Sequence, residues 1–198
     1  MTILYKLGNN LYVNITNACQ CDCIFCIRNG TEGMNENESL WLEREPSLDE
    51  ILAAFEKFGE ISKFDEVVFC GFGEPLMRHN VCIATAKHIK KKYCVNVRLN
   101  TNGLVRLVFP DFDMSELAVF DAVSVSLNAD TPEEYLRVTR PNSEIANGTC
   151  AYNAMLSFAK DAKQYTNVAL SVVGILDPKQ IENCRRIAQS LNVPFRVR

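Results

Sequence analysis

Four cysteines lie close together near the start of the chain, and their spacing is the first indication of its chemistry. The run reads Cys19-Gln-Cys-Asp-Cys23-Ile-Phe-Cys26, so Cys19, Cys23 and Cys26 form a C-x3-C-x2-C pattern, with Phe25 directly before the last cysteine. Three thiolates on one short loop can bind three irons of a [4Fe–4S] cluster, whereas clusters for electron transfer normally have four cysteine ligands. The fourth iron would then be open to a small molecule, as one position is in catalytic metal sites.

Two other readings of the cysteine run stay open at this point. A zinc site would need four Cys or His ligands, and the chain has only two histidines, His79 and His88, which lie far from the run. Cys23 and Cys26 alone could instead form a thioredoxin-like redox pair. The spacing favours the open cluster but does not decide among the three.

Length and composition indicate an ordinary globular protein. The chain has 198 residues, of which 47% are hydrophobic and 23% charged, and such a chain can bury a core. Its net charge of −3 argues against a large nucleic-acid-binding surface. We expect no signal peptide, because the short stretch Met1–Gly8 is followed by the polar Asn9 and Asn10. We also expect no membrane segment, because no apolar stretch of about 18 residues is present. The nine cysteines are an odd number and mostly scattered, which is typical of thiols without disulfides in a reducing cytoplasm.

Short β-branched runs alternate with helical patterns along the chain. This alternation predicts an α/β fold with parallel strands and right-handed crossovers. Six strand–helix repeats are too few for the usual eight-stranded barrel, so we expect one domain over residues 1–198 that forms an open, partial TIM-type barrel of about (β/α)6. The expected strands are 11–16, 67–71, 95–101, 122–127, 168–174 and 194–198, and the expected helices are 48–58, 81–92, 115–120, 132–138, 151–164 and 178–191.

The second expected strand is followed by Gly71, Gly73 and Glu74. In parallel sheets ligands bind at the carboxyl ends of the strands. Glycines let a ligand approach the main chain, and the Glu74 carboxylate could grip an ammonium group. An ordinary turn with a solvated glutamate is the alternative.

The later strand ends carry smaller groups. Asn100 and Asn102 follow the third strand and could bond ribose hydroxyls, although Asn and Gly also favour plain turns. The fourth strand ends at Ser126 and Asn128, where a serine bonded to the backbone is the alternative. The fifth ends at Val173, an apolar wall. Their order, strand by strand, predicts one ligand site on an open cluster, with Cys21 as a bystander.

These motifs together resemble the radical S-adenosylmethionine (SAM) superfamily. They are the cysteine triad, Gly-Phe-Gly-Glu-Pro at 71–75, Asn-Thr-Asn-Gly at 100–103 and Ser-Leu-Asn at 126–128. The familiar Gly-Gly-Glu-Pro turn of that superfamily has Phe72 in place of a glycine here. Within the superfamily the chain is similar to the small TatD-nuclease-linked radical SAM group, at residues 11–17, 26–28, 39–46 and 69–75.

The resemblance implies a mechanism and a set of site residues. The three cysteines would hold a [4Fe–4S] cluster whose open iron binds SAM, and Glu74 would hold the SAM amino group. Reductive cleavage would yield a 5′-deoxyadenosyl radical that removes hydrogen from an unknown substrate, as an oxidoreductase or a lyase would. The implied SAM-binding residues are Phe25, Gly73, Glu74, Asn100, Asn102, Ser126, Asn128 and Val173.

Five arginines are candidate substrate contacts. Arg137 and Arg140 are three residues apart and could hold a carboxylate or phosphate, with solvated surface charge as the alternative. Arg28 lies at the end of the cluster loop 17–28. Arg196 and Arg198 alternate in the sixth strand, so both would face the barrel interior, where a buried arginine needs an anion.

The partners of such an enzyme follow from the same interpretation. We expect a flavodoxin- or ferredoxin-type electron donor, and a homodimer or macromolecular partner that closes the open side of the barrel. The loop 27–46 is long for its position and contains the only tryptophan, Trp41, so we expect it to be a lid or a partner surface. Two alternatives remain: an activase that places a glycyl radical on a partner protein, and a non-catalytic zinc or redox module.

Overall fold

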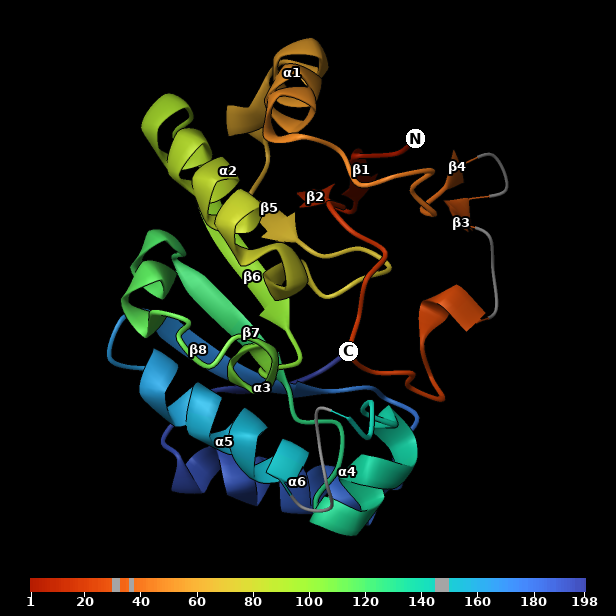
Figure 1. Cartoon of the computed structure of the whole chain (residues 1–198). Helices are drawn as coiled ribbons and strands as arrows, with labels where there is room; N and C mark the ends of the chain where they lie inside the picture. The colour runs from red at the N-terminus through yellow and green to blue at the C-terminus, as the bar shows by residue number, and fades with distance from the viewer. Residues whose placement is uncertain (30–32, 36–37, 145–149) are drawn as a thin grey trace. The chain divides into compact units, whose positions relative to one another are not determined.

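A computed structural model describes residues 1–29, 33–35, 38–144 and 150–198 (Figure 1). By their internal contacts the residues form two compact units. The first contains Met1–Cys19, Ile27–Asn100 and Glu116–Asp121, and the second contains Gln20–Cys26, Thr101–Ser115 and Ala122–Arg198. The expectation of a single domain over the whole chain stays a prediction.

The sheet of the first unit contains four strands in the order β1-β2-β5-β6. They are β1 (Leu4–Leu7), β2 (Asn10–Val13), β5 (Glu66–Phe69) and β6 (Asn96–Thr101). β1 pairs with β2 in antiparallel fashion, and the pairs β2–β5 and β5–β6 are parallel. The parallel register aligns Leu11 with Val67 and Val67 with Val97, and all three are fully buried. These rows give one face of the sheet an apolar surface that helices must cover.

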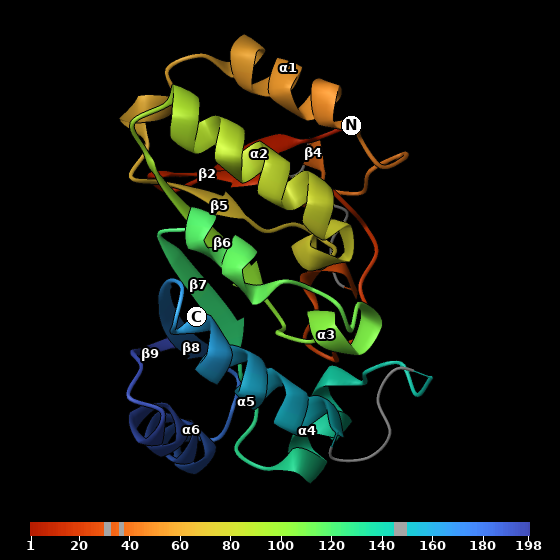
Figure 2. The ribbon, with the colours of Figure 1, turned by 60° about the vertical axis from the view of Figure 1, so that its left-hand side comes forward.

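Two helices, α1 (Leu48–Phe58) and α2 (His79–Lys92), pack side by side on this apolar face (Figures 1 and 2). Ser47 begins α1 with a capping box, in which its hydroxyl accepts from the backbone of Glu50 and the Glu50 carboxylate accepts from the backbone of Ser47. Ile51 and Phe55 point inward and are fully buried. The expected helix 48–58 is therefore confirmed residue for residue, because cap and apolar period agree.

The second unit contains β7 (Ala122–Ser126), β8 (Asn167–Val172) and β9 (Phe195–Val197), paired in parallel in that order. Helices α5 (Cys150–Ala162) and α6 (Pro178–Ser190) pack against these strands, and α4 (Pro132–Thr139) packs against α5 (Figure 2). A short α3 (Val105–Val108) also contacts α5. The alternation of strands and helices confirms the predicted α/β class.

Strand β1 and its hairpin were not expected from the sequence. Gly8 has a φ of 58° and makes the turn into β2, a conformation that glycine adopts without cost. β2 also ends at Val13, before the expected Thr16, because Asn14 and Thr16 use their side chains to bond another segment. The six predicted strands are all present, and β1 adds an antiparallel strand at the edge of the first unit's sheet.

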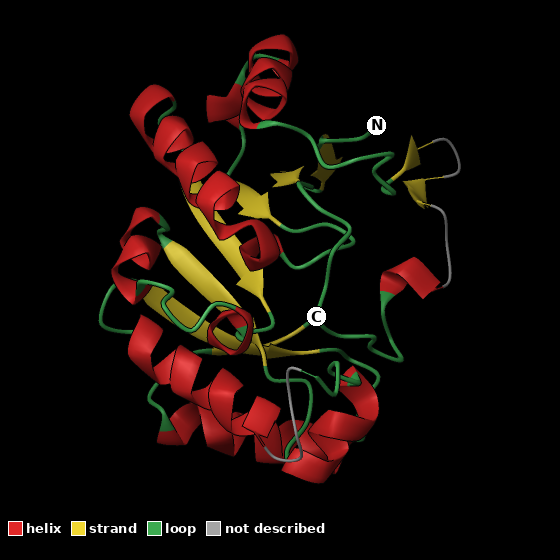
Figure 3. Cartoon of the chain, in the orientation of Figure 1, coloured by secondary structure: helices red, strands yellow, loops and turns green. Residues whose placement is uncertain are grey.

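The remaining elements are short. The small strands β3 (Gly33–Asn35) and β4 (Glu38–Ser39) pair with each other. The described residues also form four 3-10 helices: η1 (Ile27–Asn29), η2 (Ile61–Lys63), η3 (Pro75–Arg78) and η4 (Met114–Val119). Apart from one isolated bridge at Cys21, the chain between β2 and η1 is loop, drawn green in Figure 3. The cysteines therefore lie on irregular backbone, whose placement depends on contacts with other segments.

Candidate active site

The loop that leads to Cys19 is fixed to the turn after β5. The backbone N–H of Glu74 donates to the carbonyl of Ala18 at 2.9 Å. Gly73 lies so close that a Cβ there would be 2.4 Å from the carbonyl oxygen of Thr16 and 2.6 Å from that of Ala18. Only glycine allows such a backbone approach. The Gly-Glu-Pro turn therefore supports the chain one residue before Cys19.

The side chain of Glu74 is buried, with 5% of it exposed. Its Oε1 accepts a hydrogen bond from the backbone N–H of Leu76 at 3.1 Å and so caps η3. Burial, and to a smaller extent the charge of Glu74, raises the pKa of the Cys82 thiol well above its ordinary value. The carboxylate of Glu74 is therefore buried and oriented by a hydrogen bond, unlike the solvated glutamate of an ordinary turn. Its contact with a ligand stays a prediction.

The rest of the cysteine loop belongs to the second unit and is bonded to the end of α4. Backbone hydrogen bonds join residues 20–24 to residues 138–142. They run from Asp22 N to Arg140 O (3.1 Å), from Ile24 N to Val138 O (2.9 Å) and from Asn142 N to Gln20 O (2.8 Å). Residues 138–142, which include the predicted substrate contact Arg140, therefore support the cysteine loop through their backbone. Backbone pairing of this kind has no side-chain signature in the sequence.

Cys21 differs from the other three cysteines of the run. It is 4% exposed, forms an isolated bridge with Pro141, and its sulfur lies 3.9 Å from the donating Nδ2 of Asn102. Cys19, Cys23 and Cys26 are half-buried. The N–H of Cys26 donates to the carbonyl of Cys23 at 3.0 Å, which closes a tight turn between these two thiols.

The donor set fits a cluster with three protein ligands. All nine cysteines lie in the described part of the chain, and none of them forms a disulfide. Within residues 1–29, 33–35, 38–144 and 150–198, no three His, Cys, Asp or Glu side chains are grouped as in a preformed metal site. The fit rests instead on chemistry: three half-buried thiols share one short loop, and thiolates are the ligands of iron–sulfur clusters.

The two asparagines after β6 have different partners. The Oδ1 of Asn100 accepts from Nη1 of Arg98 at 2.8 Å, and Nε of Arg98 is 2.8 Å from Glu66. The Oδ1 of Asn102 accepts from Nε2 of Gln20 at 3.1 Å. Asn102 therefore ties the cysteine loop of the second unit in place, whereas Asn100 belongs to a half-buried charged group on β5 and β6.

Asn128 is the most unusual residue at the end of β7. It has a φ of 57°, is 4% exposed, and its buried Oδ1 has no hydrogen-bond partner among the described residues. A buried acceptor left unpaired costs about 1–3 kcal/mol, so such a group requires an explanation. Nearby in sequence, the hydroxyl of Ser126 accepts from Nη2 of Arg198 at 2.9 Å. Val173, after β8, is half-buried.

Two candidate arginines are surface residues in this structure, contrary to the expectation. Arg196 and Arg198 are exposed, because β9 lies at the edge of the second unit's sheet and pairs only with β8 among the described strands of that unit. The prediction of a buried pair was wrong, and with it the need for a buried anion. Any contact with substrate stays a prediction.

The other candidates divide between local pairing and half-burial. Arg137 forms hydrogen bonds of 2.7 and 2.6 Å with Glu134 on the same helix, which agrees with the alternative of surface charge. Arg140 is exposed and ends α4 with a φ of 44°. Phe25 and Arg28 are half-buried, and their predicted roles are not decided by these positions.

The predicted lid, residues 27–46, lies partly outside the described residues, since 30–32 and 36–37 are not described. Its end is well placed by apolar contacts. Trp41 packs edge-on against Phe72, with ring centroids 5.1 Å apart, and Phe72 is buried in a cluster with Tyr5 and Leu40. The phenylalanine that replaces the superfamily's usual glycine is therefore an anchor for this segment.

Comparisons with known proteins agree with this arrangement. Residues 13–189 match the radical SAM superfamily. The chain belongs to that superfamily. It is 30% identical over 131 residues to a probable GTP 3′,8-cyclase of Methanocaldococcus jannaschii (66% of this chain, 40% of the relative). It is 30% identical over 142 residues to a GTP 3′,8-cyclase of Rhodopseudomonas palustris (66% and 36%), and 24% identical over 196 residues to a GTPase Obg of Brachyspira hyodysenteriae (89% and 28%).

Membership confirms several predictions at the level of the superfamily. This radical SAM protein is an enzyme of a class that uses a [4Fe–4S] cluster and SAM, which sets the non-catalytic module aside. Its α/β architecture, with mostly parallel strands, is consistent with the predicted partial TIM-type barrel. The TatD-linked subgroup is not confirmed. The chain spans less than half the length of these relatives. No described helix is long and apolar enough to span a membrane.

Proposed function

We propose that this radical SAM enzyme binds its cluster through Cys19, Cys23 and Cys26 and cleaves SAM reductively. The observation that carries the proposal is the contrast within the cysteine run. Cys21 is buried and its sulfur and backbone are engaged with Asn102 and Pro141, whereas the other three thiols are half-buried. A set of three ligands leaves one iron for SAM.

Cys19, Cys23 and Cys26 would hold the cluster, which when bound would supply the electron for cleavage of a carbon–sulfur bond of SAM, with methionine and the 5′-deoxyadenosyl radical as the products. The protein binds, orients and excludes water. In the first unit, Glu74 is a buried carboxylate, and its bond to Leu76 fixes its orientation. A cation is the natural partner of such a group, so we assign it the SAM ammonium.

Asn128 offers the corresponding support in the second unit. Its Oδ1 is buried and meets no donor within the part of the chain that the structure describes, and a ribose hydroxyl or amino group of SAM would supply one. The hydroxyl of Ser126 and the amide of Asn100 already bond Arg198 and Arg98. We therefore rank Asn128 above both as a SAM contact, and we assign Asn102 to support of the cysteine loop.

The reduction requires an electron donor, and we propose a flavodoxin- or ferredoxin-type protein in the cytoplasm, where the thiols stay reduced. The proposal ends at radical formation and hydrogen abstraction. The relatives named GTP 3′,8-cyclase are matched over 40% and 36% of their length, so their substrate is not assigned to this chain. The activase alternative has no observation in its favour.

The test is anaerobic reconstitution with iron and sulfide, followed by reduction in the presence of SAM. We expect about four irons per chain, and methionine and 5′-deoxyadenosine well above those of a Cys23→Ala variant. The same yield from wild type and variant would disprove the proposal. A deuterium-transfer screen into 5′-deoxyadenosine would then identify the substrate.

A further inference from the structure

Residues 40–46, called the strap from here on, run beside the loop of residues 14–18 that leads to Cys19. The strap is anchored by apolar side chains, since Leu40 and Leu42 are 1% and 5% exposed. Leu40 packs with Phe72, and Trp41 contacts the same ring edge-on. These contacts alone would make the strap a cover for the first unit.

The polar contacts of the strap are more specific than a cover needs. The fully buried Asn14 donates through Nδ2 to the carbonyl of Leu40 at 2.7 Å. Asn17 makes two bonds to the backbone of Leu42: its Nδ2 donates to the carbonyl at 2.7 Å, and its Oδ1 accepts from the N–H at 3.1 Å. Two asparagine side chains of the 14–17 stretch therefore bond the strap backbone at two points, Leu40 and Leu42.

Thr16, three residues before Cys19, bonds the carboxylate of Glu45 on the strap. The hydroxyl of Thr16, 2% exposed, donates to Oε1 of Glu45 at 2.6 Å, and the same hydroxyl accepts from the N–H of Ala18 at 2.9 Å. Glu45 in turn lies 3.1 Å from Nε of Arg78 through its Oε2. The 2.6 Å between the Thr16 hydroxyl and the Glu45 carboxylate is typical of a charge-assisted hydrogen bond.

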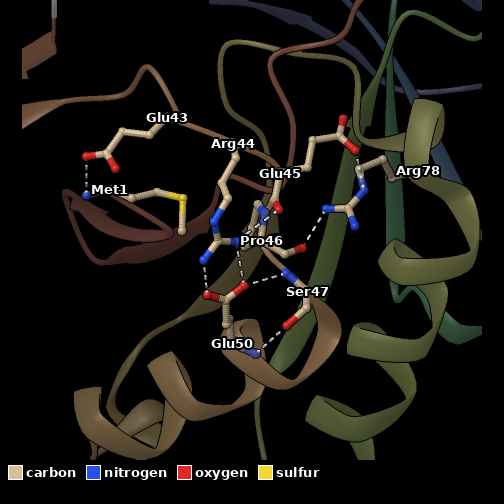
Figure 4. A network of polar contacts seen from close by, with 8 residues as sticks. All are labelled: Met1, Glu43, Arg44, Glu45, Pro46, Ser47, Glu50 and Arg78. Carbon is tan, nitrogen blue, oxygen red and sulfur yellow. Dashed lines mark hydrogen bonds and ion pairs between the residues drawn. The ribbon is translucent and has the colours of Figure 1, made fainter.

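Arg78 joins the two segments directly. Its Nη1 donates to the carbonyl of Ile15 at 2.8 Å and to that of Pro46, on the strap, at 2.8 Å. Figure 4 shows its guanidinium between Glu45 and Pro46. One planar cation thus fixes the backbone of the cysteine loop, the end of the strap and the carboxylate that holds Thr16.

We propose that the strap positions Cys19, with Thr16, Glu45 and Arg78 as its positioning residues. The inference rests on the proposed function only in that Cys19 is taken as a cluster ligand. Each residue from 14 to 18 is bonded outside its own segment or to Thr16. The chain before Cys19 is therefore ordered before metal arrives, and less conformational entropy is lost when the cluster binds.

The chain provides a matched control on the strap itself. Arg44 bonds Glu50 through both terminal nitrogens, one at 2.8 Å and the other at 2.5 Å, and Figure 4 shows this pair directed toward the start of α1. Glu50→Ala removes a carboxylate from the same network region as Glu45→Ala, and it also breaks the capping box of α1. This variant should lower the free energy of unfolding without changing the placement of Cys19.

The experiment compares Thr16→Val, Thr16→Ser, Glu45→Ala and Glu50→Ala in the full chain. In the metal-free protein, the alkylation rate of Cys19 is measured by peptide mass spectrometry against the exposed Cys94. In the reconstituted protein, the rate of iron loss to a chelator and the EPR change on adding SAM are measured. We expect Thr16→Val and Glu45→Ala to speed alkylation and iron loss about tenfold, with Thr16→Ser and Glu50→Ala near wild type.

The proposal is overturned if Glu50→Ala matches Glu45→Ala in these rates, because general destabilisation would then explain both, or if Glu45→Ala behaves as wild type. Glu45 is half exposed at its side chain, 50%, so this variant can be expected to fold even where Thr16→Val does not. Alkylation needs no cluster. If the wild-type protein binds no iron, the proposed function is refuted. The alkylation rates of the metal-free variants would still decide whether the strap positions Cys19.

Discussion

Glu74 donates its backbone N–H to the carbonyl of Ala18 at 2.9 Å, and so joins the turn after β5 to the chain directly before Cys19. The side chain of the same residue caps η3, because its Oε1 accepts a hydrogen bond from the backbone N–H of Leu76. One residue thus supports a predicted cluster ligand with its main chain and holds a buried carboxylate with its side chain. Changes at this turn should therefore affect cysteine placement before they affect the core.

Gly73→Ala tests the close approach of the two loops. The added Cβ would lie 2.4 Å from the carbonyl oxygen of Thr16, so the backbone must move, at a cost of about 1–3 kcal/mol. We expect a lower melting temperature and a lower iron content after reconstitution. Gly174→Ala is the control, since its Cβ would meet its nearest atom at 3.3 Å; equal effects of the two changes would contradict the explanation.

Phe72→Gly restores the glycine that the superfamily usually has at this position, yet it should weaken this protein. The change removes a 4% exposed aromatic ring from its cluster with Tyr5 and Leu40, which typically costs about 3–5 kcal/mol. Trp41 is the only tryptophan and loses its edge-on partner, so its fluorescence should shift to the red. Phe72→Leu should keep most of the stability, and an unchanged emission spectrum in Phe72→Gly would count against the anchor role.

The sequence predicted those elements whose local signals agree with their burial. The amphipathic pattern of residues 48–58, with Ser47 as the N-cap, predicts the helix, and the structure adds the reciprocal bond of Glu50 to the backbone of Ser47 and the burial of Ile51 and Phe55. The β1 hairpin was not predicted, although Gly8, with its positive φ, lies between its two strands.

The sequence predicted the candidate ligands of the site but not the segments that hold these ligands in place. The cysteine spacing and Glu74 are visible as residue types at fixed positions. By contrast, the strap bonds backbone carbonyls through Asn14 and Asn17, and the 138–142 segment pairs with the cysteine loop through backbone alone. Such contacts depend on tertiary placement, so a single sequence does not reveal them. The same reason explains the error at Arg196 and Arg198, where strand alternation says nothing of which strand is at the edge.

Cys21→Ala separates a bystander from a ligand. Because Cys21 is 4% exposed and contacts Asn102 through its sulfur, the change should cost about 1 kcal/mol of stability and leave iron content and SAM cleavage near wild type. Cys26→Ala should do the opposite, with little loss of stability in the metal-free protein and loss of iron. Iron and sulfide analysis beside thermal unfolding checks both, and loss of iron in Cys21→Ala would make Cys21 a ligand.

Alkaline pH should weaken the second unit through Cys184. Burial, and then the nearby charge of Asp130, raises the pKa of this thiol to about 12, well above the ordinary value of a cysteine. The folded state therefore favours the neutral thiol, so its contribution is complete below about pH 9 and is lost as the pH rises toward 12. The melting temperature should fall between pH 9 and 11, and the fall should be smaller in Cys184→Ala.

Cys94→Ala, at an exposed thiol, controls for the removal of a cysteine as such. Tyr152 contributes in the same direction, since burial raises its pKa to about 12 as well. A Tyr152→Phe background therefore isolates the thiol. Identical slopes with and without Cys184 in that background would show that the thiol does not control alkaline stability.

Asn128→Gly should separate binding from stability. Glycine adopts the positive φ of this position more readily than asparagine. The buried Oδ1 that the change removes is unpaired as far as the described residues go, so the free energy of unfolding should change by less than about 1 kcal/mol. The KM for SAM should rise about tenfold, because a hydrogen bond to a buried acceptor is worth about 1–2 kcal/mol. Asn192→Gly, at another position of positive φ (52°), is the matched control: it should leave KM unchanged. If both variants keep the wild-type KM, the unpaired oxygen of Asn128 does not bind SAM, and the assignment of this residue falls.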